Sequence, residues 1–404
     1  MEIKDGKLPK DFTKEFQTKE SFHSYFEDLY KQGIQHFLQA ELDEHLGYQK
    51  HKVEGYNSGN SRNGSFDKTI KSETFGDIVL SIPRDRNGKF EPQIIPKGET
   101  MSQKIEEAIL GMYARGMTRS DIVEQVKSVY GISVSESTIS TISDKILIDV
   151  EEWTKRALDA QYLIVWMDAV HLKVRSDGKY INQAMHVVIG LRADGMKEVL
   201  GMWLNKVESA SFWMTVLSDL KSRGVEDIII ACTDNLTGFT KAIKGVYPET
   251  ITQLCIVHQI RNSMKFVVTK DLREFCKDLK NIYTSNNEEQ AVEALKLLKS
   301  KWVEKYKYAI DSWERNWENL MPFLEYPPEL RKIMYTTNTI ENLNRGIRKY
   351  TKTKVQFPDE RSVKKSVYLA ILNNEKSWKT PILKWGLIMN QFLVIFGQRC
   401  RIEH

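Results

Sequence analysis

Two aspartates stand at the ends of apolar segments that have the composition of buried strands. Asp168 lies near the end of the run LIVWMDAV, and Asp234 directly follows the run IIIACT. Two carboxylates held together at the edge of an apolar core repel each other and lose hydrating water, and a hard divalent cation offsets both costs. The pair therefore predicts a site for Mg²⁺ or Mn²⁺. Two such ions can activate a water or a 3′-hydroxyl for in-line displacement at a phosphodiester.

A third carboxylate, Glu341, stands on a helix that we expect Asn338 to cap. On that helix Glu341, Arg345 and Arg348 share a face, so a metal-binding carboxylate would be accompanied by bases suited to DNA phosphates. Each acid has a structural alternative, because the aspartates could be turn or capping residues and Glu341 could complete a capping box. Two strand-end aspartates together with a later helical glutamate favour a two-ion site.

Cys255 and His258 form a Cys-x-x-His element in the segment LCIVHQIRN. A zinc site would need two more ligands, and Cys276 is the only nearby candidate, so the spacing disfavours zinc. Two intervening residues suit one turn of a helix that leaves a strand. His258 could then reach the active site and hydrogen-bond DNA or a phosphate, although a purely structural pairing of Cys255 with His258 fits the spacing equally well.

Basic residues gather in one segment of the chain. The whole sequence has 59 Lys and Arg against 54 Asp and Glu, a net charge of only +5, whereas residues 331–365 carry ten bases against three acids. Such a cluster is typical of a surface that binds a phosphate backbone, and a solvated helix face is the alternative. Lys173 and Arg175, which follow the first aspartate, are either phosphate contacts or solvated charges. The candidate DNA-binding residues are Lys173, Arg175, Arg261, Arg345, Arg348, Lys349, Lys352 and Lys354.

The elements that must position these residues follow a recognisable order. Residues 161–205 contain three apolar segments separated by the turn signals SDGK and RADGM, which predicts an antiparallel meander. A helix, a buried strand, a second helix and a fifth strand, ITQLCIVH, come next. This order predicts an α/β fold with a ribonuclease-H-like mixed sheet, in which the strands that carry Asp168 and Asp234 are neighbours. The two carboxylates would then converge.

The front of the chain predicts helices and a ribbon. Apolar residues from Phe22 to Phe37 recur at helical spacing, and the polar run GYNSGNSRNGS after them is typical of a linker or loop. Residues 69–86 alternate as in a short β-ribbon closed by Pro83. Three short helices follow, with caps at Thr118 and Ser135, and the third, Glu136 to Lys145, would be the recognition helix of a helix-turn-helix. A structural bundle of three helices is equally compatible.

After the fifth strand the sequence becomes helical, and we expect an all-helical insertion before the segment that carries Glu341. Its Trp313 and Trp317 are one turn apart, which favours core packing over a base-stacking platform. The expected regions are an N-terminal helical region (1–60), a β-ribbon and linker (61–98), a helix-turn-helix region (99–150), the first part of the catalytic core (151–259), the helical insertion (260–330) and the C-terminal helices of the core (331–404).

Composition limits the possible classes. At 404 residues the chain is long enough for several modules, and no stretch approaches the length of a membrane span. Its four cysteines have no paired spacing and its first twenty residues are charged throughout, so we expect no secretory signal and a reducing cytoplasm.

Four segments resemble the motif blocks of the Mutator-like family of bacterial insertion-sequence transposases, in that family's order. They are DAVHLKVR, ACTDNLTGF, LCIVHQIRN and YTTNTIENLNRGIRKYTK. The resemblance spans nearly the whole chain and implies a DDE catalytic domain of ribonuclease-H-like fold with a helical insertion before the glutamate. It further implies Asp168, Asp234 and Glu341 as the triad that binds two Mg²⁺ or Mn²⁺ ions. Cys255 and His258 would be the family's Cys-x-x-His element, and His171 stands where many members have tyrosine.

The function that we expect from this resemblance is DNA transposition. The protein would bind the terminal inverted repeats of an insertion sequence, cleave the DNA at the element's ends and join the 3′-hydroxyls to target DNA. Its partner would be double-stranded DNA, and it would act on the bacterial nucleoid as a homodimer or a larger synaptic oligomer, without a membrane. The alternatives are a ribonuclease-H-like nuclease that only hydrolyses, and a non-catalytic DNA-binding protein derived from a transposase. The intact triad argues against a pure binder.

Overall fold

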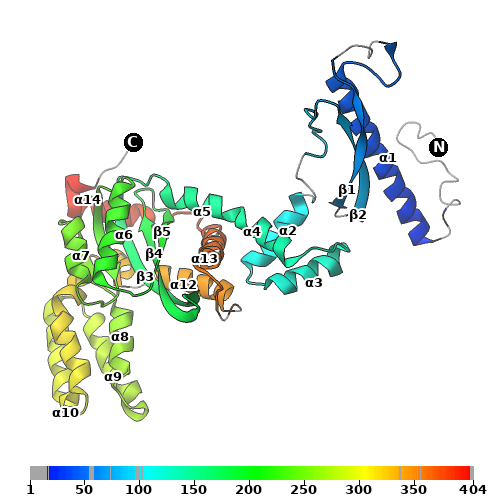
Figure 1. The fold of residues 1–404 in the computed structure, drawn as a ribbon. Coiled ribbons are helices and arrows are strands. Elements are labelled where there is room, and N and C mark those ends of the chain that lie inside the picture. Colours follow the sequence, from blue (N-terminus) through cyan, green and yellow to red (C-terminus); the bar gives the residue numbers. More distant parts are fainter. Residues whose placement is uncertain are drawn as a thin grey trace. The chain divides into compact units, whose positions relative to one another are not determined.

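The computed structural model describes residues 16, 18–53, 59–72, 74–96, 101, 103–335, 338–352, 354 and 356–400. The chain divides into two compact units, which are described separately (Figure 1). The first comprises Met1–Tyr113 and Thr118–Ile142, and the second comprises Ala114–Met117 and Ser143–His404.

A long helix packed on a β-hairpin begins the first unit. Its elements are α1 (Lys19–Leu46), β1 (Arg62–Ser72) and β2 (Gly76–Asp85). Helix α1 starts with a capping box between Thr18 and Ser21 and ends at Gly47, whose φ of 77° is the left-handed conformation of a helix C-cap. The core between the helix and the hairpin contains Leu38, Ile78, Leu80, Ile82 and Ile95.

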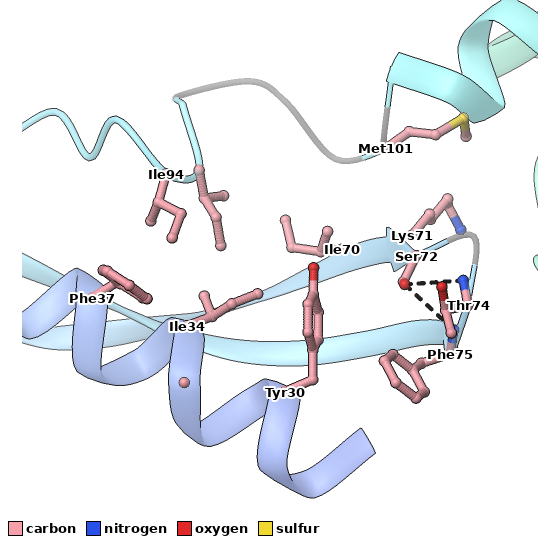
Figure 2. Close-up of a pocket in the computed structure, with 12 residues that line it drawn as sticks. Tyr30, Ile34, Phe37, Ile70, Lys71, Ser72, Thr74, Phe75, Ile94 and Met101 are labelled. Atoms are coloured by element: carbon pink, nitrogen blue, oxygen red, sulfur yellow. Dashed lines mark hydrogen bonds between the residues drawn. The ribbon is translucent and has the colours of Figure 1, made fainter. Parts of the chain in front are cut away.

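The apolar stripe of α1 that the sequence predicts is only partly covered. A pocket of about 580 Å³ lies beside the helix, and Figure 2 shows Tyr30, Ile34 and Phe37 projecting from α1 into it, toward Ile70 and Ile94. Phe37 remains 62% exposed. The lining is mostly apolar and carries no convergent acids, so we do not place the predicted chemistry here.

The prediction of a polar linker over residues 55–65 is wrong from Arg62 onward, because β1 begins there; residues 55–58 lie outside the described residues. Arg62 pairs with Asp85 of β2, its guanidinium forms an ion pair with Asp43, and it donates to the carbonyl of Tyr48 at 2.8 Å. Gly64, with a φ of 67°, accommodates the bulge between Arg62 and Ser65. Pairing with β2 and the ion pair with Asp43 of α1 therefore hold this segment in a strand, although its composition is typical of a loop.

Three short helices follow at the predicted positions, with the predicted caps. They are α2 (Gln103–Ala114), α3 (Arg119–Tyr130) and α4 (Glu136–Asp144). The Thr118 hydroxyl accepts from the amide of Asp121, whose carboxylate accepts from the amide of Thr118 in return. Ser135 Oγ accepts from the amide of Thr138 at 3.1 Å. A further helix, α5 (Ile146–Lys155), begins after Lys145, so residue 150 lies inside a helix.

The second unit is built on a five-stranded mixed sheet, as predicted. The strand order is β5-β4-β3-β6-β7, in which β3, β4 and β5 are antiparallel and β6 and β7 run parallel to β3. A tight turn at Asp177 and Gly178, both with positive φ, joins β3 to β4. The strands are β3 (Gln161–Ser176), β4 (Lys179–Leu191), β5 (Lys197–Asn205), β6 (Asp227–Thr233) and β7 (Ile251–Leu254).

Helices cover both faces of this sheet. On one face α6 (Ala210–Ser222) and α7 (Phe239–Val246) share a core with the strands that includes Trp213, Leu217 and Phe239. On the other face the Trp166 indole donates to the carbonyl of Ile333 in α11 (Pro328–Tyr335), and Cys232 Sγ donates to that of Met334. Side chains of β3 and β6 thus reach the same covering helix.

Two strand boundaries differ from the sequence prediction. Strand β3 does not end near Asp168 but continues to Ser176, because the residues beyond Asp168 remain paired with β4. Strand β7 ends at Leu254 instead of His258, since Cys255 caps the helix that follows.

The rest of the second unit is helical, which includes the predicted insertion. Helices α8 (Ile256–Met264), α9 (Thr269–Tyr283) and α10 (Glu288–Leu320) pack against one another (Figure 1). Helix α10 has a kink at Tyr306. Trp313 is fully buried and donates to Ser263 Oγ at 2.9 Å, whereas Trp317 is half-buried and donates to Glu288. No helix of the described chain is long and apolar enough to cross a membrane. The α-helices that follow α11 in this unit are α12 (Asn338–Thr351), α13 (Glu360–Glu375) and α14 (Trp385–Phe396).

The close packing of side chains from neighbouring strands of the sheet can be tested at Gly190. A methyl group there would overlap the Tyr162 ring and come within 3.0 Å of Leu200. We expect Gly190→Ala to lower the free energy of unfolding by about 1–3 kcal/mol. Gly386→Ala is the matched control, because that exposed helical position is open and alanine improves helix propensity by up to about 1 kcal/mol. Denaturant unfolding measures both, and equal stability of the two variants would contradict the packing.

Candidate active site

The register between β3 and β6 brings Asp168 and Asp234 side by side. The parallel pairing ends with Trp166 opposite Cys232, and each aspartate lies two residues further along its chain. Because side chains alternate along a strand, Asp168 belongs to the face on which Trp166 and Cys232 contact α11, and Asp234 follows directly after the end of β6. Asp168 thus lies in the middle of β3, just beyond the last residue of β3 that pairs with β6. A ligand can approach the sheet at this point, where the pairing of the two strands ends.

Asp168 is held by hydrogen bonds and surrounded by charges. Its Oδ2 accepts from the Asn344 amide at 2.6 Å, and its Oδ1 accepts from the backbone of Ala169 at 2.8 Å. Burial raises the pKa of the Asp168 carboxyl, and the negative charge of Glu341 raises it further, while the positive charges of His258 and Arg348 lower it. The fold therefore brings residues of β3, α8 and α12 together around one carboxylate.

Asp234 is the second buried carboxylate. Burial, followed by the negative charges of Glu208 and Asp168, raises the pKa of Asp234 to about 7, and a backbone hydrogen bond from Leu236 opposes this rise. Its Oδ1 is buried without a hydrogen-bond partner among the described residues. A buried acceptor of this kind is unusual, and a ligand would satisfy it.

Glu341 lies in the first turn of α12 with its side chain 19% exposed. Its carboxylate accepts from the guanidinium of Arg261, on α8, at 2.6 Å. Asn338 is the first residue of α12 and not its cap, so the prediction of an Asn338 cap is wrong; residue 337 lies outside the described residues. Asn344 and Arg348 follow at three and seven residues, on the same helix face as Glu341.

Cys255 has a structural role at the start of α8, whereas the His258 side chain lies near the acids. The Cys255 thiol is the N-cap of α8 and accepts from the amide of His258 at 3.2 Å. The His258 ring is close enough to Asp168 and Glu208 to lower the pKa of both carboxyls, and its Nδ1 is buried without a partner in the described structure. The two-residue spacing thus serves the helix start, while the histidine side chain faces the acids.

The donor atoms suit a hard cation, although they are not gathered around one point. Carboxylate and amide oxygens are the ligands that Mg²⁺ and Mn²⁺ prefer, and the buried Oδ1 atoms of Asp234 and Asn344 are without protein partners in the described chain. Over the same residues no group of three or more His, Cys, Asp or Glu side chains could hold a metal ion as it stands. The Glu341 carboxylate is hydrogen-bonded to Arg261.

Two residues of this site were missed in the sequence. Asn344 is 2% exposed, and its spacing of three residues from Glu341 on an amphipathic helix could have indicated it. Glu208 lies in the short link between β5 and α6, with its side chain 16% exposed and 3.9 Å from His171. No pattern in the sequence connects a glutamate in that link with acids 40 residues before and 26 residues after it.

The predicted basic cluster of residues 331–365 is smaller than its composition suggests. Arg331 donates to the backbone carbonyls of four residues in neighbouring segments, and the buried Lys365 bonds Ser143 and Asp144. These two bases therefore stabilise the fold. Lys354 is partly buried and donates to Ser366. The exposed candidates are Lys173, Arg175, Arg261, Arg345, Arg348, Lys349 and Lys352.

A family model and several curated relatives match this chain over most of its length. The family model described as "Transposase, Mutator family" matches residues 4–381. The probable transposase for insertion sequence element ISRM3-like of Sinorhizobium fredii is 41% identical over 374 residues, 92% of each chain. The transposase for insertion sequence element IS905 of Lactococcus lactis is 34% identical over 89% of this chain and 91% of its own. A cryoEM structure of a simian T-cell lymphotropic virus intasome covers 52% of this chain and 68% of its own at 12% identity, with a TM-score of 0.19, which is too low to carry an argument.

The raised pKa of Asp234 predicts how the stability of the metal-free protein depends on pH. The folded state holds this proton more tightly than the unfolded chain, so the stabilisation is complete below pH about 4 and is lost as pH rises through about 7. In EDTA, we expect Asp234→Asn to be more stable than the parent at pH 8, by on the order of 1–2 kcal/mol, and to depend less on pH. Denaturant unfolding at pH 5 and 8 measures this. Asp177→Asn, in an exposed turn, is the control, and a parent as stable at pH 8 as at pH 5 would contradict the expectation.

Proposed function

The chain belongs to the Mutator family of transposases, and on that premise we propose that it cleaves DNA at the ends of an insertion sequence and joins the 3′-hydroxyls to target DNA. The family match extends over nearly the whole chain, and the relatives that cover about nine tenths of it are named transposases for insertion sequence elements. The proposal concerns the chemistry and its residues, which the comparisons leave open.

The observation that carries the proposal is the pairing of β3 with β6, which sets Asp168 beside Asp234. We assign Asp168, Asp234 and Glu341 as the residues that hold Mg²⁺ or Mn²⁺, because they supply charged oxygen donors around buried, unsatisfied atoms. When bound, two such ions supply activation of the attacking water or 3′-hydroxyl and stabilisation of the leaving oxygen. The core is then a ribonuclease-H-like domain, which the strand order of the mixed sheet supports.

Other residues orient the acids and bind the DNA backbone. Asn344 fixes the Asp168 carboxylate through Oδ2, and Arg261 holds Glu341 until DNA and cation bind. Arg261 is 55% exposed, so it can exchange the carboxylate for a phosphate. His258 faces the acids and is a candidate hydrogen-bond donor to a phosphate oxygen. The other exposed bases, Lys173, Arg175, Arg345, Arg348, Lys349 and Lys352, would neutralise phosphates along the bound DNA.

Helices α3 and α4 are candidates for recognition of the terminal inverted repeats, since α4 follows a capped turn and exposes hydroxyl side chains at Ser137 and Thr141. Transposition brings two element ends together, so the protein would work as a homodimer or a larger synaptic oligomer on nucleoid DNA in the bacterial cytoplasm. A nuclease that only hydrolyses would use the same acids, but the family match favours strand transfer.

Asp168→Asn tests the proposed chemistry. It keeps the shape of the side chain but removes the charge that a cation needs, so cleavage and joining should fall by at least about a thousandfold while binding to element ends persists. A gel assay of 3′-end cleavage in Mn²⁺, with a gel shift for binding, measures both. Asp177→Asn should be as active as the parent, because its side chain is 91% exposed in a turn. Parental cleavage by Asp168→Asn would contradict the assignment.

Glu341→Gln distinguishes a metal ligand from a structural residue. Glutamine can still accept a hydrogen bond from Arg261, so the melting temperature in EDTA should change little. On the catalytic assignment, cleavage should nevertheless decrease by orders of magnitude. A variant that melts and cuts like the parent would remove Glu341 from the site. Glu360→Gln, at the start of α13, is the control glutamate on the next helix.

A double variant tests recognition by α4. Ser137→Ala with Thr141→Ala removes two exposed hydroxyls without a change in charge, so the preference for element ends over random duplex should fall by about tenfold or more. Affinity for random duplex should stay the same, because phosphate contacts come from basic residues. Competition gel shifts measure both quantities, with Ser218→Ala on the exposed side of α6 as control. An unchanged preference would leave α4 as part of a structural bundle.

A further inference from the structure

Glu208 is built into the same site from a different part of the chain. It occupies the link between β5 and α6, and its Oε2 lies 3.9 Å from Nε2 of His171, three residues beyond Asp168 on β3. The neighbouring first turn of α6 packs on the loop that follows Asp234, because a Cβ at Gly238 would lie 3.2 Å from that of Ala210. Glu208 is therefore fixed on one side by the strand of the first aspartate and on the other by the loop of the second.

Electrostatics agree with this position. Burial raises the pKa of the Glu208 carboxyl, and the charge of Asp168 raises it further, while His171 and His258 act in the opposite direction. In return, Glu208 is the strongest neighbouring charge that acts on Asp234. Glu208 thus interacts with both proposed metal-binding aspartates.

The protein compensates this carboxylate only in part. The fully buried Trp213 indole faces Glu208 and lowers the pKa of its carboxyl, but neither Glu208 Oε1 nor Trp213 Nε1 has a hydrogen-bond partner of ordinary geometry among the described residues. Glu208 is not needed as a helix cap, because the Ser209 hydroxyl accepts from Phe212 at 3.2 Å as the N-cap of α6. The pair with His171 is weak, because the two atoms are 3.9 Å apart and the His171 side chain is exposed to solvent.

A mostly buried carboxylate that is only partly compensated and stands near two others is costly to keep unless a cation binds there. We propose that Glu208 is a fourth acidic residue of the catalytic site and binds a divalent cation together with Asp234. This inference rests on the proposed function, because it assumes the cation site of Asp168 and Asp234. It adds an oxygen donor from the β5–α6 link to donors from β3, the β6–α7 loop and α12.

The test measures cation binding without DNA or catalysis. The full-length protein is titrated with Mn²⁺, and free Mn²⁺ is counted by its electron paramagnetic resonance signal. We expect Glu208→Gln to weaken Mn²⁺ affinity by about tenfold or more. Its melting temperature in EDTA should equal or exceed that of the parent, because one repelling charge is gone. In the cleavage assay, high Mn²⁺ should partly restore the activity of this variant.

Glu226→Gln is the matched control, because Glu226 is exposed and precedes β6 at the strand end opposite Asp234. It should bind Mn²⁺ like the parent. If Glu208→Gln does not fold, as judged by circular dichroism, Glu208→Asp replaces it: the shortened carboxylate should still weaken Mn²⁺ binding at least about fivefold. Mn²⁺ affinity within twofold of the parent in the folded variant would overturn the inference.

Asp168→Asn separates failure of this inference from failure of the proposed function. If Asp168→Asn loses Mn²⁺ binding and cleavage while Glu208→Gln retains parental affinity, the catalytic site stands and Glu208 is not part of it. If neither variant loses Mn²⁺ affinity and both cleave like the parent, the proposed cation site itself is wrong, and the inference falls with it.

Discussion

The parallel pairing of β3 with β6 is the constraint on which the site depends. Its register places Trp166 opposite Cys232, and Asp168 and Asp234 each follow two residues further along the chain. Burial, followed by the negative charges of Glu208 and Asp168, raises the pKa of Asp234 to about 7. The apolar strands that hold the pair in place make the site costly without a ligand.

The surrounding elements supply positive charge and polar atoms that lower this cost. His258 on α8 and Arg348 on α12 lower the pKa of Asp168, and Asn344 donates to its carboxylate. Arg261 and Glu341 form an ion pair between the same two helices. Helices α8 and α12 therefore bring both Glu341 and these bases to the sheet.

Family membership and geometry answer different questions. The match to Mutator transposases extends from residue 4 to residue 381 and fixes the class of protein. It does not say why two residues separate Cys255 from His258, which the structure explains by a thiol that caps α8 and an imidazole that faces the acids. Nor does the match indicate Glu208, whose buried oxygen becomes evident only when the β5–α6 link is placed beside His171.

The sequence by itself determined the order of strands and helices and the caps at Thr118 and Ser135. These features depend on residues close together in the chain, where periodicity and spacing carry the information. The three acids that we propose as a triad are a prediction from the sequence as well, which rests on the ends of the apolar strands and on the resemblance to the family. Only the tertiary structure showed that Arg62 starts a strand, that Arg331 and Lys365 hydrogen-bond other segments of the protein, and that Asn344 and Glu208 lie near the two aspartates. Each of these depends on a contact between distant segments, and local pattern cannot encode which segments will meet.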